Sequence, residues 1–326
     1  MNYRYVVFSP YFGKLPNTFN LWLKSCEYNK NFKFIVFTDD KNSYVLPDNV
    51  IIIQMTFNSF KEKLQKKFDF SLGLNTPYKL CDFKPTYGYA LDEYLNNCEY
   101  WGHCDLDMIF GDLEKFLPNK QYDKISTLGH LCLYRNCKTI NKAFMLKGDS
   151  SIDYKDILGN DLHFGFDEIG DYGINKIFEI NKLSVYNYEE NVADISILNE
   201  NMTITIKKDG KFHRSFGDRI FSFENGKILS HTLEDDKIKI QEFAYIHIKK
   251  RKMHIDESID YCKFIITYKE YKKYEVITKE IIMTNQPPKR MINKYWIKSK
   301  LGSIKVRMNR RLKIRQIIKE KFNEKW

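Results

Sequence analysis

Strands and helices alternate along the first third of this chain. Apolar stretches with strand character occupy residues 3–9, 32–38, 49–55 and 98–104, and helical patterns lie between them. Such alternation predicts an α/β fold with a mostly parallel, Rossmann-like sheet and helices on both faces. Because the ligands of these sheets bind beyond the carboxyl ends of the strands, a functional site is expected where these strands end.

The pattern changes after residue 120. A further strand is expected at 124–134 and a short helix at 174–180, and residues 183–248 alternate as antiparallel strands do, with Asp-Gly and Asn-Gly turn signals among them. We therefore predict one large unit over residues 1–286, which is divided into a parallel half at 1–120 and an antiparallel, β-rich half at 121–286, and a separate tail at 287–326.

The tail that follows Pro287-Pro288 carries most of the net charge. The chain has a formal net charge of +11, and from residue 289 onward 14 Lys or Arg residues face only two Glu. Apolar residues recur there at helical spacing, which predicts a basic helix with an apolar stripe of Ile314, Ile317, Ile318, Phe322 and Trp326. Such a helix either lies on an anionic membrane surface, through residues 291–326, or packs on the main domain with its basic face in water. The terminal Trp favours the membrane surface.

Several classes of protein are disfavoured by the sequence. The positive charge is confined to the tail and no recognised nucleic-acid-binding motif accompanies it, so no nucleic-acid partner is expected. The seven cysteines are odd in number and form no CxxC pair, which indicates reduced thiols. No apolar run reaches the roughly 18 residues of a membrane span, and no signal-peptide pattern begins the chain. The expected location is cytoplasmic, peripheral on the inner face of the cell membrane.

Two carboxylates follow the strand at 98–104. Asp105 and Asp107 lie in the stretch WGHCDLDMIFGDL, residues 101–113, and residues two apart in an extended segment point to the same face. Two carboxylates on one face repel each other unless a cation lies between them, and a divalent ion that bridges phosphate oxygens meets this need. A pair of solvated turn residues is the alternative. The buried-looking strand before them favours a Mn²⁺ or Mg²⁺ site.

Two other motifs carry candidate chemistry. In YKLCDFKP, residues 78–85, Lys79 and Asp82 lie three apart and share a helix face, either to contact a ligand or as a surface ion pair. Asp167 and Glu168 lie in the Gly-flanked stretch FGFDEIGDYG, where they offer a general base for an acceptor hydroxyl or cap a helix.

A late histidine, His247, is followed by a basic run that includes Lys249 and Arg251. A neutral imidazole can complete a metal site, and neighbouring cations can hold diphosphate oxygens. A structural histidine on a strand is the alternative interpretation.

Four stretches together resemble those of GT-A-type glycosyltransferases: YKLCDFKP, YWGHCDLDMIFGDL, FGFDEIGDYG and YIHIKKRKM. More narrowly, residues 1–255 resemble a family of uncharacterised bacterial glycosyltransferase-like proteins that is associated with capsule or surface-polysaccharide synthesis. The resemblance implies a metal-dependent enzyme that moves a sugar from a nucleotide-sugar, with UDP as the expected nucleotide, to a glycan or lipid-linked glycan acceptor.

The resemblance also implies roles for individual residues. Asp105, Asp107 and His247 are expected to hold Mn²⁺ or Mg²⁺ and, through it, the donor diphosphate. Asp167 or Glu168 is expected on the acceptor side, where a base in line with the acceptor hydroxyl makes the reaction inverting and the lack of such a base leaves a retaining route. Donor contacts are expected from Ser9, Phe12, Gly13, Asp39, Lys79, Asp82, Lys249 and Arg251.

Other functions remain as alternatives at this point. A non-catalytic sugar- or nucleotide-binding relic of the same fold keeps the binding residues without turnover. A nucleic-acid-binding protein that uses the basic tail, and a nucleotidyltransferase with an acidic metal site, have less support, because the motifs that these classes need are missing from the sequence.

Overall fold

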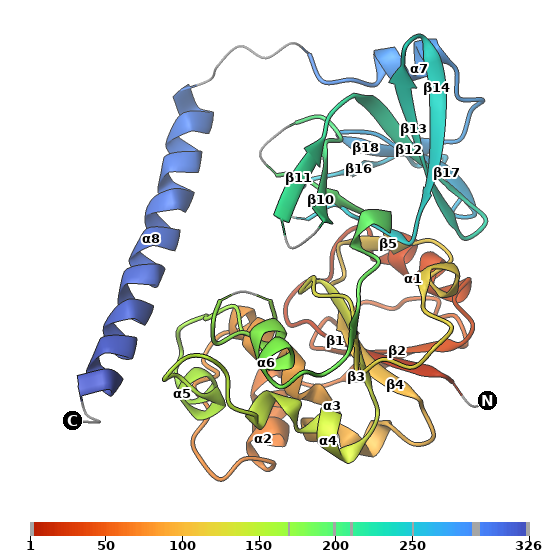
Figure 1. The fold of residues 1–326 in the computed structure, drawn as a ribbon. Coiled ribbons are helices and arrows are strands. Elements are labelled where there is room, and N and C mark those ends of the chain that lie inside the picture. Colours follow the sequence, from red (N-terminus) through yellow and green to blue (C-terminus); the bar gives the residue numbers. More distant parts are fainter. Residues whose placement is uncertain are drawn as a thin grey trace.

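In the structure the first half comprises residues 3–186 and is built on a seven-stranded sheet with the order β3-β2-β1-β4-β7-β6-β8 (Figure 1). The fold is seen in a computed structural model that describes residues 3–168, 170–197, 200–208, 211–249, 251–288 and 294–323. Four strands are parallel, as the sequence predicts: β1 (Tyr5–Pro10), β2 (Phe32–Thr38), β3 (Val50–Gln54) and β4 (Tyr100–Cys104). The chain proceeds from β1 to β2 and β3 on one side and returns to β4 on the other, so the crevice beyond β1 and β4 is the position at which such sheets bind ligands.

The strand expected at 124–134 is two strands instead. β6 (Lys124–Ile125) and β7 (Leu131–Arg135) pair antiparallel, and β7 also runs antiparallel to β4. The reason is local, because Ser126 has a φ of 70° and this left-handed backbone turns the chain out of the strand. The short strand β8 (Val185–Tyr186) completes the sheet beside β6.

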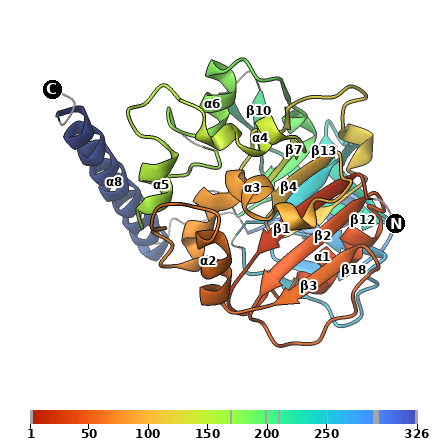
Figure 2. The ribbon, with the colours of Figure 1, turned by 90° about the horizontal axis from the view of Figure 1, so that it is seen from below.

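Helices cover both faces of this sheet (Figure 2). On one face, α1 (Phe19–Glu27) buries Phe19 and Trp22 against the aromatic side chains of β1 and β2. On the other face lie α2 (Phe57–Gln65), α3 (Tyr87–Ala90), α4 (Lys138–Asn141), α5 (Tyr154–Gly159) and α6 (Ile174–Ile180). These two layers give the protein a mixed α/β architecture, in which each side of the sheet has its own hydrophobic core.

The stretch YKLCDFKP forms a 3₁₀ helix, η1 (Pro77–Thr86), rather than the expected α-helix. Pro85 lies inside it and has no backbone N–H, which disfavours a regular α-helix at this point. Further 3₁₀ turns are η2 (Asp92–Tyr94), η3 (Glu114–Phe116), η4 (Ala143–Met145) and η5 (Glu189–Asn191).

The second half forms two smaller sheets, with β5 joining one of them, and most strand pairs are antiparallel, as predicted, whereas β9 with β15 and β16 with β18 are parallel. One has the order β11-β10-β9-β15-β5 and the other the order β14-β13-β12-β17-β18-β16. The first contains β5 (Met108–Phe110), β9 (Val192–Ile195), β10 (Ile204–Lys208), β11 (Lys211–Ser215) and β15 (Tyr245–His247). The second contains β12 (Asp218–Glu224), β13 (Lys227–Glu234), β14 (Lys237–Phe243), β16 (His254–Ile255), β17 (Lys263–Ile266) and β18 (Glu270–Lys273).

Two features of this half are relevant to the site. β5 follows Asp107 directly, so the acidic loop after β4 connects the large sheet to the first small sheet. The turn between β12 and β13 is made by Asn225 and Gly226, whose φ values of 48° and 86° are those of a tight hairpin turn, as the Asn-Gly signal predicts.

After α7 (Lys279–Thr284), the predicted tail helix is α8 (Lys294–Asn323), which runs alongside the first half next to α5 (Figures 1 and 2). Ile314 is only 5% exposed, and Ile317 and Ile318 pack against the same core. The predicted apolar stripe therefore packs on the domain where it is described, which is the second of the two arrangements that the sequence left open. Trp326 and the side chain of Phe322 lie outside the described residues. Among the described residues, none of the helices has both the length and the apolar composition that crossing a membrane requires.

Candidate active site

Strand register brings Asp105, Asp107 and His247 together. Asp105 follows β4, Asp107 precedes β5, and β15 pairs antiparallel with β5 so that His247 lies opposite Met108. The candidate ligand atoms of the three side chains all lie within 4.8 Å of one another. The His247 Nε2 is 3.3 Å from the Asp107 Oδ1. The predicted metal-site residues are thus brought together from segments 140 residues apart, with two carboxylates and one imidazole as the donor set.

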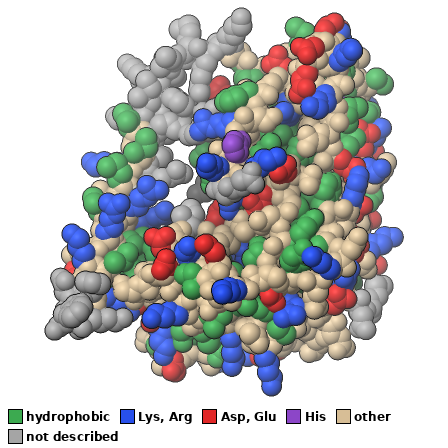
Figure 3. Space-filling model, viewed as in Figure 1, with side chains coloured by type: hydrophobic (Ala, Val, Ile, Leu, Met, Phe, Trp, Pro, Cys, Tyr) green, Lys and Arg blue, Asp and Glu red, His purple; other side chains and the backbone are tan. Residues whose placement is uncertain are grey.

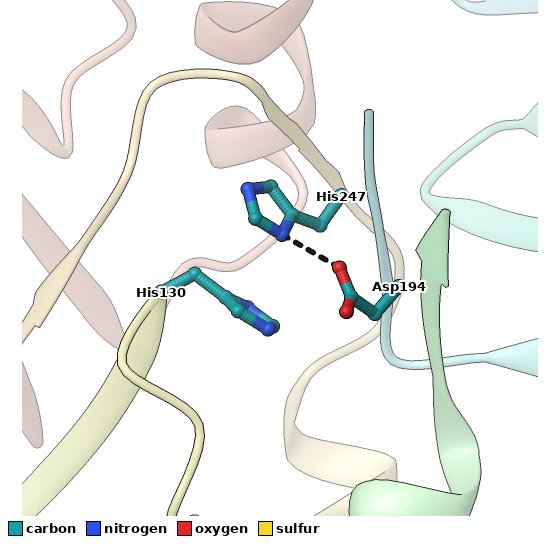
Figure 4. A group of neighbouring side chains, drawn as sticks. All are labelled: His130, Asp194 and His247. Carbon is teal, nitrogen blue, oxygen red and sulfur yellow. Dashed lines mark hydrogen bonds and ion pairs between the residues drawn. The ribbon is translucent and has the colours of Figure 1, made fainter. Parts of the chain in front are cut away.

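A third acid, Asp194, orients His247 through the ring nitrogen that does not face Asp107. β9 pairs with β15 so that Asp194 lies beside His247, and the Nδ1 of His247 is 2.9 Å from the Asp194 Oδ1 (Figure 4). Metal-binding histidines commonly have such a carboxylate on the nitrogen that does not face the metal. The other Asp194 oxygen accepts from Lys249 Nζ at 2.8 Å. This arrangement fits a divalent ion at the Nε2 of His247.

The same contacts determine the charge on His247. Burial lowers the pKa of His247, but the hydrogen bonds to Asp107 and Asp194 outweigh it and raise the pKa to about 9. Without a metal, a protonated His247 therefore holds Asp107 in place. A metal ion that binds Nε2 has to displace this proton, so metal affinity is expected to rise with pH.

The neighbouring His130 is neutral. Its ring centroid lies 4.2 Å from that of His247, and its Nδ1 is 3.2 Å from the Tyr245 hydroxyl (Figure 4). Burial, together with the adjacent His247, lowers the pKa of His130 well below its usual value of 6.5. Its Nε2 is buried without a hydrogen-bond partner among the described residues. A neutral ring is the form that can pack closely against a charged one.

Lys84 lies between Asp105 of the acidic loop and Asp167, one of the two predicted catalytic acids. Its Nζ lies 2.7 Å from the Asp105 Oδ1, donates to the Gly129 carbonyl at 2.7 Å, and is 3.5 Å from the Asp167 Oδ2. Burial lowers the pKa of Lys84, but Asp105 and the other nearby acids outweigh it and raise the pKa well above its usual value. A permanent cation therefore lies beside the candidate metal site, where developing negative charge on a substrate can be stabilised.

The two predicted catalytic acids lie beside this cation. Asp167 is 7% exposed, and burial raises its pKa to about 7, although Lys84 acts against this rise. Glu168 is half-buried, and burial also raises its pKa. The carboxylates of both approach Gly129 so closely that a Cβ there would lie 2.9 Å from Asp167 and 3.1 Å from Glu168. A carboxyl group with a pKa near 7 can exchange a proton at neutral pH.

A cavity of about 520 Å³ opens beyond the carboxyl ends of β1 and β4. Asp105, Asp107 and Lys84 form part of its lining. Much of the remaining surface is apolar or aromatic and includes Tyr11 and Tyr271. A largely apolar cleft with a few convergent charged groups is typical of a small-molecule site.

Four of the predicted donor contacts line this cavity: Ser9, Phe12, Lys249 and Arg251. The Ser9 hydroxyl donates to the Cys104 carbonyl at 3.0 Å and so connects the ends of β1 and β4. The guanidinium of Arg251 donates to the carbonyls of Ser196 and Asn201, both at 2.9 Å. Arg251 therefore anchors the loop between β9 and β10 at the edge of the cavity.

Two other predicted donor contacts, Gly13 and Asp39, are not part of the cavity lining. The Gly13 N–H donates to the Asp39 Oδ1 at 2.6 Å, and Gly13 has a φ of 105°, a conformation that favours glycine. The neighbouring Asp40 accepts from the Leu15 N–H at 2.8 Å. These acids hold the loop after β1, and this positions Phe12 against the cavity.

Lys79 and Asp82, the remaining predicted donor contacts, are not part of the cavity lining. The two side chains are 1% and 0% exposed and bind each other at 2.8 Å. Lys79 also donates a hydrogen bond to the Ile157 carbonyl at 2.7 Å. Asp82 accepts hydrogen bonds from the backbone N–H groups of residues 164, 165 and 166. Lys84, rather than this pair, contacts the candidate site through Asp105. The pair instead positions the segment that carries Asp167.

Lys84, Asp194 and His130 are site residues that the sequence interpretation missed. Asp194 had a readable signal, since an acid inside the apolar strand VADI needs a partner when it is buried. Lys84 lies within the motif YKLCDFKP, but helical spacing pairs Lys79 with Asp82 and does not single out Lys84. His130 lies in a turn, and no local pattern marks it.

A comparison with protein families adds one finding. The sequence model of one protein family, described as a family of unknown function (DUF6625), matches residues 7–275. This range is most of the chain and includes every site residue named above. The chain belongs to this family. No curated protein matches the chain. Helix α8 lies outside the DUF6625 match, so the candidate site and the tail helix are separate parts of this family member.

Asp194 is expected to act on metal affinity without touching the metal. In an Asp194→Asn variant, His247 keeps a hydrogen-bond acceptor but loses the negative charge behind it. Mn²⁺ affinity measured by isothermal titration calorimetry is expected to fall about 10- to 100-fold, the range seen when such carboxylates are removed. Unchanged affinity in a variant with the wild-type melting temperature would mean that His247 is not a ligand.

Asp167 is expected to make stability fall as the pH rises. Its pKa is about 7 in the folded protein against 3.8 as the ordinary value, so between these pH values the folded state binds a proton that the unfolded state does not. Its contribution to the free energy of unfolding is full below about pH 4 and declines by up to about 1.4 kcal/mol per pH unit until pH 7. Urea unfolding from pH 4 to 8 is expected to show a flatter decline for Asp167→Asn than for the wild type. An unchanged slope would place the Asp167 pKa near its ordinary value.

Proposed function

We propose that this protein is a metal-dependent glycosyltransferase of the GT-A type. It takes a nucleotide-sugar donor, with UDP as the favoured nucleotide, and transfers the sugar to a glycan or lipid-linked glycan acceptor in bacterial surface-polysaccharide synthesis. The observation that carries the proposal is the convergence of Asp105, Asp107 and His247 at the edge of a 520 Å³ cavity beyond β1 and β4. The cavity, the acids and the cation Lys84 lie together where a parallel sheet binds nucleotides.

The donor set supports Mn²⁺ or Mg²⁺ as the cofactor. Asp105 and Asp107 offer carboxylate oxygens that suit either ion, and the imidazole of His247 favours Mn²⁺, because Mg²⁺ prefers oxygen ligands. Bound there, the ion neutralises charge on the diphosphate leaving group. The protein residues hold these ligands in place before the donor arrives, through Asp194 on His247 and Lys84 on Asp105.

The cavity walls support a nucleotide as the donor group. The aromatic side chains of Tyr11, Phe12 and Tyr271 offer surface for a base, and Lys249 and Lys84 offer positive charge for phosphate oxygens. The apolar walls exclude water from the anomeric carbon, which limits hydrolysis of the donor.

Asp167 is the better of the two acids for the acceptor side. Its pKa of about 7 lets it take a proton from an acceptor hydroxyl at neutral pH, and Lys84 stabilises the carboxylate form. A base in this role makes the transfer inverting. Glu168, at the same turn, is the second choice.

A nucleotide and metal screen tests this function. The thermal shift of the wild type is measured with UDP, GDP and CDP, each with and without Mn²⁺, and compared with that of Asp105→Ala/Asp107→Ala. We expect a shift with one nucleotide, UDP first, that requires Mn²⁺ and is lost in the variant. The absence of a shift with all three nucleotides would argue against the proposal. A metal-dependent shift without donor hydrolysis or transfer would favour a nucleotide-binding relic of the fold.

A further inference from the structure

Helix α8 has a second apolar stripe on the side away from the domain. Leu301, Ile304, Met308 and Leu312 are 59%, 51%, 57% and 58% exposed. Their spacing of three, four and four residues places them on one face of the helix. Four aliphatic side chains in a row in water need a partner, since scattered single residues are normal on a surface but a continuous stripe is not.

Cations lie along the same side of α8. Lys305, Arg311, Arg315 and Lys319 are exposed, and each lies three, four or seven residues from a member of the stripe. Figure 3 shows hydrophobic and basic side chains close together along this helix. The sequence of α8 contains one acid, Glu320, which accepts a hydrogen bond from Gln316. The outward face therefore combines aliphatic side chains with positive charge.

The opposite side of α8 is held on the domain. Ile314 is buried in the core of the first half, Arg310 Nη1 is 2.8 Å from His163 Nδ1, and Lys321 forms an ion pair with Asp156 near α5. These contacts fix the rotation of the helix about its axis. The stripe from Leu301 to Leu312 consequently faces outward and cannot pack on the same core at the same time.

We propose that α8 docks this outward face on an anionic lipid surface. Aliphatic side chains enter the boundary between headgroups and acyl chains, and Lys and Arg pair with anionic headgroups. A nucleic acid offers partners for the cations but not for the four aliphatic side chains. A second copy of this chain would bring the same cations against each other across a twofold axis. Of these three partners, the lipid surface is the one that can contact both the aliphatic side chains and the cations of this face.

Docking in this orientation puts the lipid on one side of α8 and the cavity on its other side, toward the domain. Arg310 of α8 contacts His163, whose ring lies 4.8 Å from that of Tyr78, and Tyr78 lines the cavity. A lipid-linked acceptor held at that surface would then be separated from the cavity side of the domain by one helix. This consequence depends on the proposed function, whereas the docking itself does not.

Vesicle co-sedimentation of the full-length protein, without metal or nucleotide, tests the docking. The wild type is expected to bind vesicles of phosphatidylcholine with phosphatidylglycerol and to leave pure phosphatidylcholine vesicles largely unbound. Binding is expected to weaken at least about 10-fold in an apolar-stripe variant and about 100-fold in a cation variant at low salt. The apolar-stripe variant is Leu301→Gln/Ile304→Gln/Met308→Gln/Leu312→Gln, and the cation variant is Lys305→Gln/Arg311→Gln/Arg315→Gln/Lys319→Gln.

A matched control removes four exposed aliphatic or aromatic side chains elsewhere and is expected to bind as the wild type does. It is Val45→Gln/Phe216→Gln/Ile240→Gln/Val276→Gln, whose positions are 59% to 94% exposed. Melting temperatures show whether each variant folds. No binding of the wild type to anionic vesicles, or equal binding of the apolar-stripe variant, would overturn the docking. A wild-type dimer that the apolar-stripe variant dissociates would assign the face to a second copy, and tight nucleic-acid binding with no vesicle binding would assign it to nucleic acid.

Discussion

An Asp107→Asn variant is expected to lose metal-dependent activity. The substitution keeps the shape of the side chain but removes the charge that faces both the metal position and the His247 Nε2. Donor turnover with Mn²⁺ is expected to fall at least about 1,000-fold, because a ligand and a source of charge stabilisation are lost together. Mn²⁺ affinity, measured without nucleotide, is expected to fall more than about 100-fold, which exceeds the loss expected for a carboxylate that only orients a ligand.

The same stretch of sequence supplies the control. Asp112 lies five residues after Asp107 and is exposed. Its Oδ1 accepts a hydrogen bond from the Lys115 N–H. An Asp112→Asn variant is expected to keep wild-type turnover and Mn²⁺ affinity. Equal losses in both variants would show that an Asp→Asn change anywhere in this stretch is disruptive. Wild-type Mn²⁺ affinity in Asp107→Asn would show that Asp107 is not a metal ligand.

An Asp82→Ala variant is expected to lose much of the stability of the protein. The substitution leaves Lys79 buried without its counter-charge and leaves the N–H groups of residues 164, 165 and 166 without an acceptor. Breaking one partner of a buried pair costs about 3–5 kcal/mol, and urea unfolding measures this loss directly. Because Asp167 follows this segment, activity is expected to fall as well.

A surface pair of the same geometry is the matched control. Lys24 and Glu27 are also three residues apart with an N–O distance of 2.8 Å, but the Glu27 side chain is 52% exposed. A Glu27→Ala variant is expected to show no measurable loss, since water screens such pairs. The double variant Lys79→Met/Asp82→Ala is expected to be less destabilised than the sum of the two single variants, because it leaves no unpaired charge. Additive losses would mean that the two side chains do not interact.

Much of the fold was predictable because its signals are local. The strand at 32–38 and the helix at 174–180 have the predicted bounds, since a run of apolar β-formers and a Gly-bounded helical pattern each depend on neighbouring residues. The error at 124–134 came from Ser126, because a left-handed φ at a serine leaves no clear mark in the sequence. Pro85 shows the converse, since a proline is plain in the sequence and disfavours a regular α-helix within η1.

The spacing of neighbouring residues predicted only part of the site. Asp105 and Asp107 share one loop, so their spacing alone indicates a shared face. Lys79 and Asp82 share a motif with Lys84, yet the first two bind each other, whereas Lys84 binds Asp105 at the candidate site. Local spacing cannot distinguish these outcomes, because burial depends on which segments pack against η1.

By itself, the sequence of this protein determined the parallel sheet, the acidic loop at the end of β4, the hairpin at Asn225-Gly226 and the basic tail helix. Each of these depends on residues that are neighbours in the chain. Only the tertiary structure decided that His247, Asp194 and Asp107 meet, because the pairing of β15 with β5 and β9 joins segments far apart in the sequence. It also decided which side of α8 faces the domain, because a helix with apolar residues on two sides can bury either one until a core selects between them.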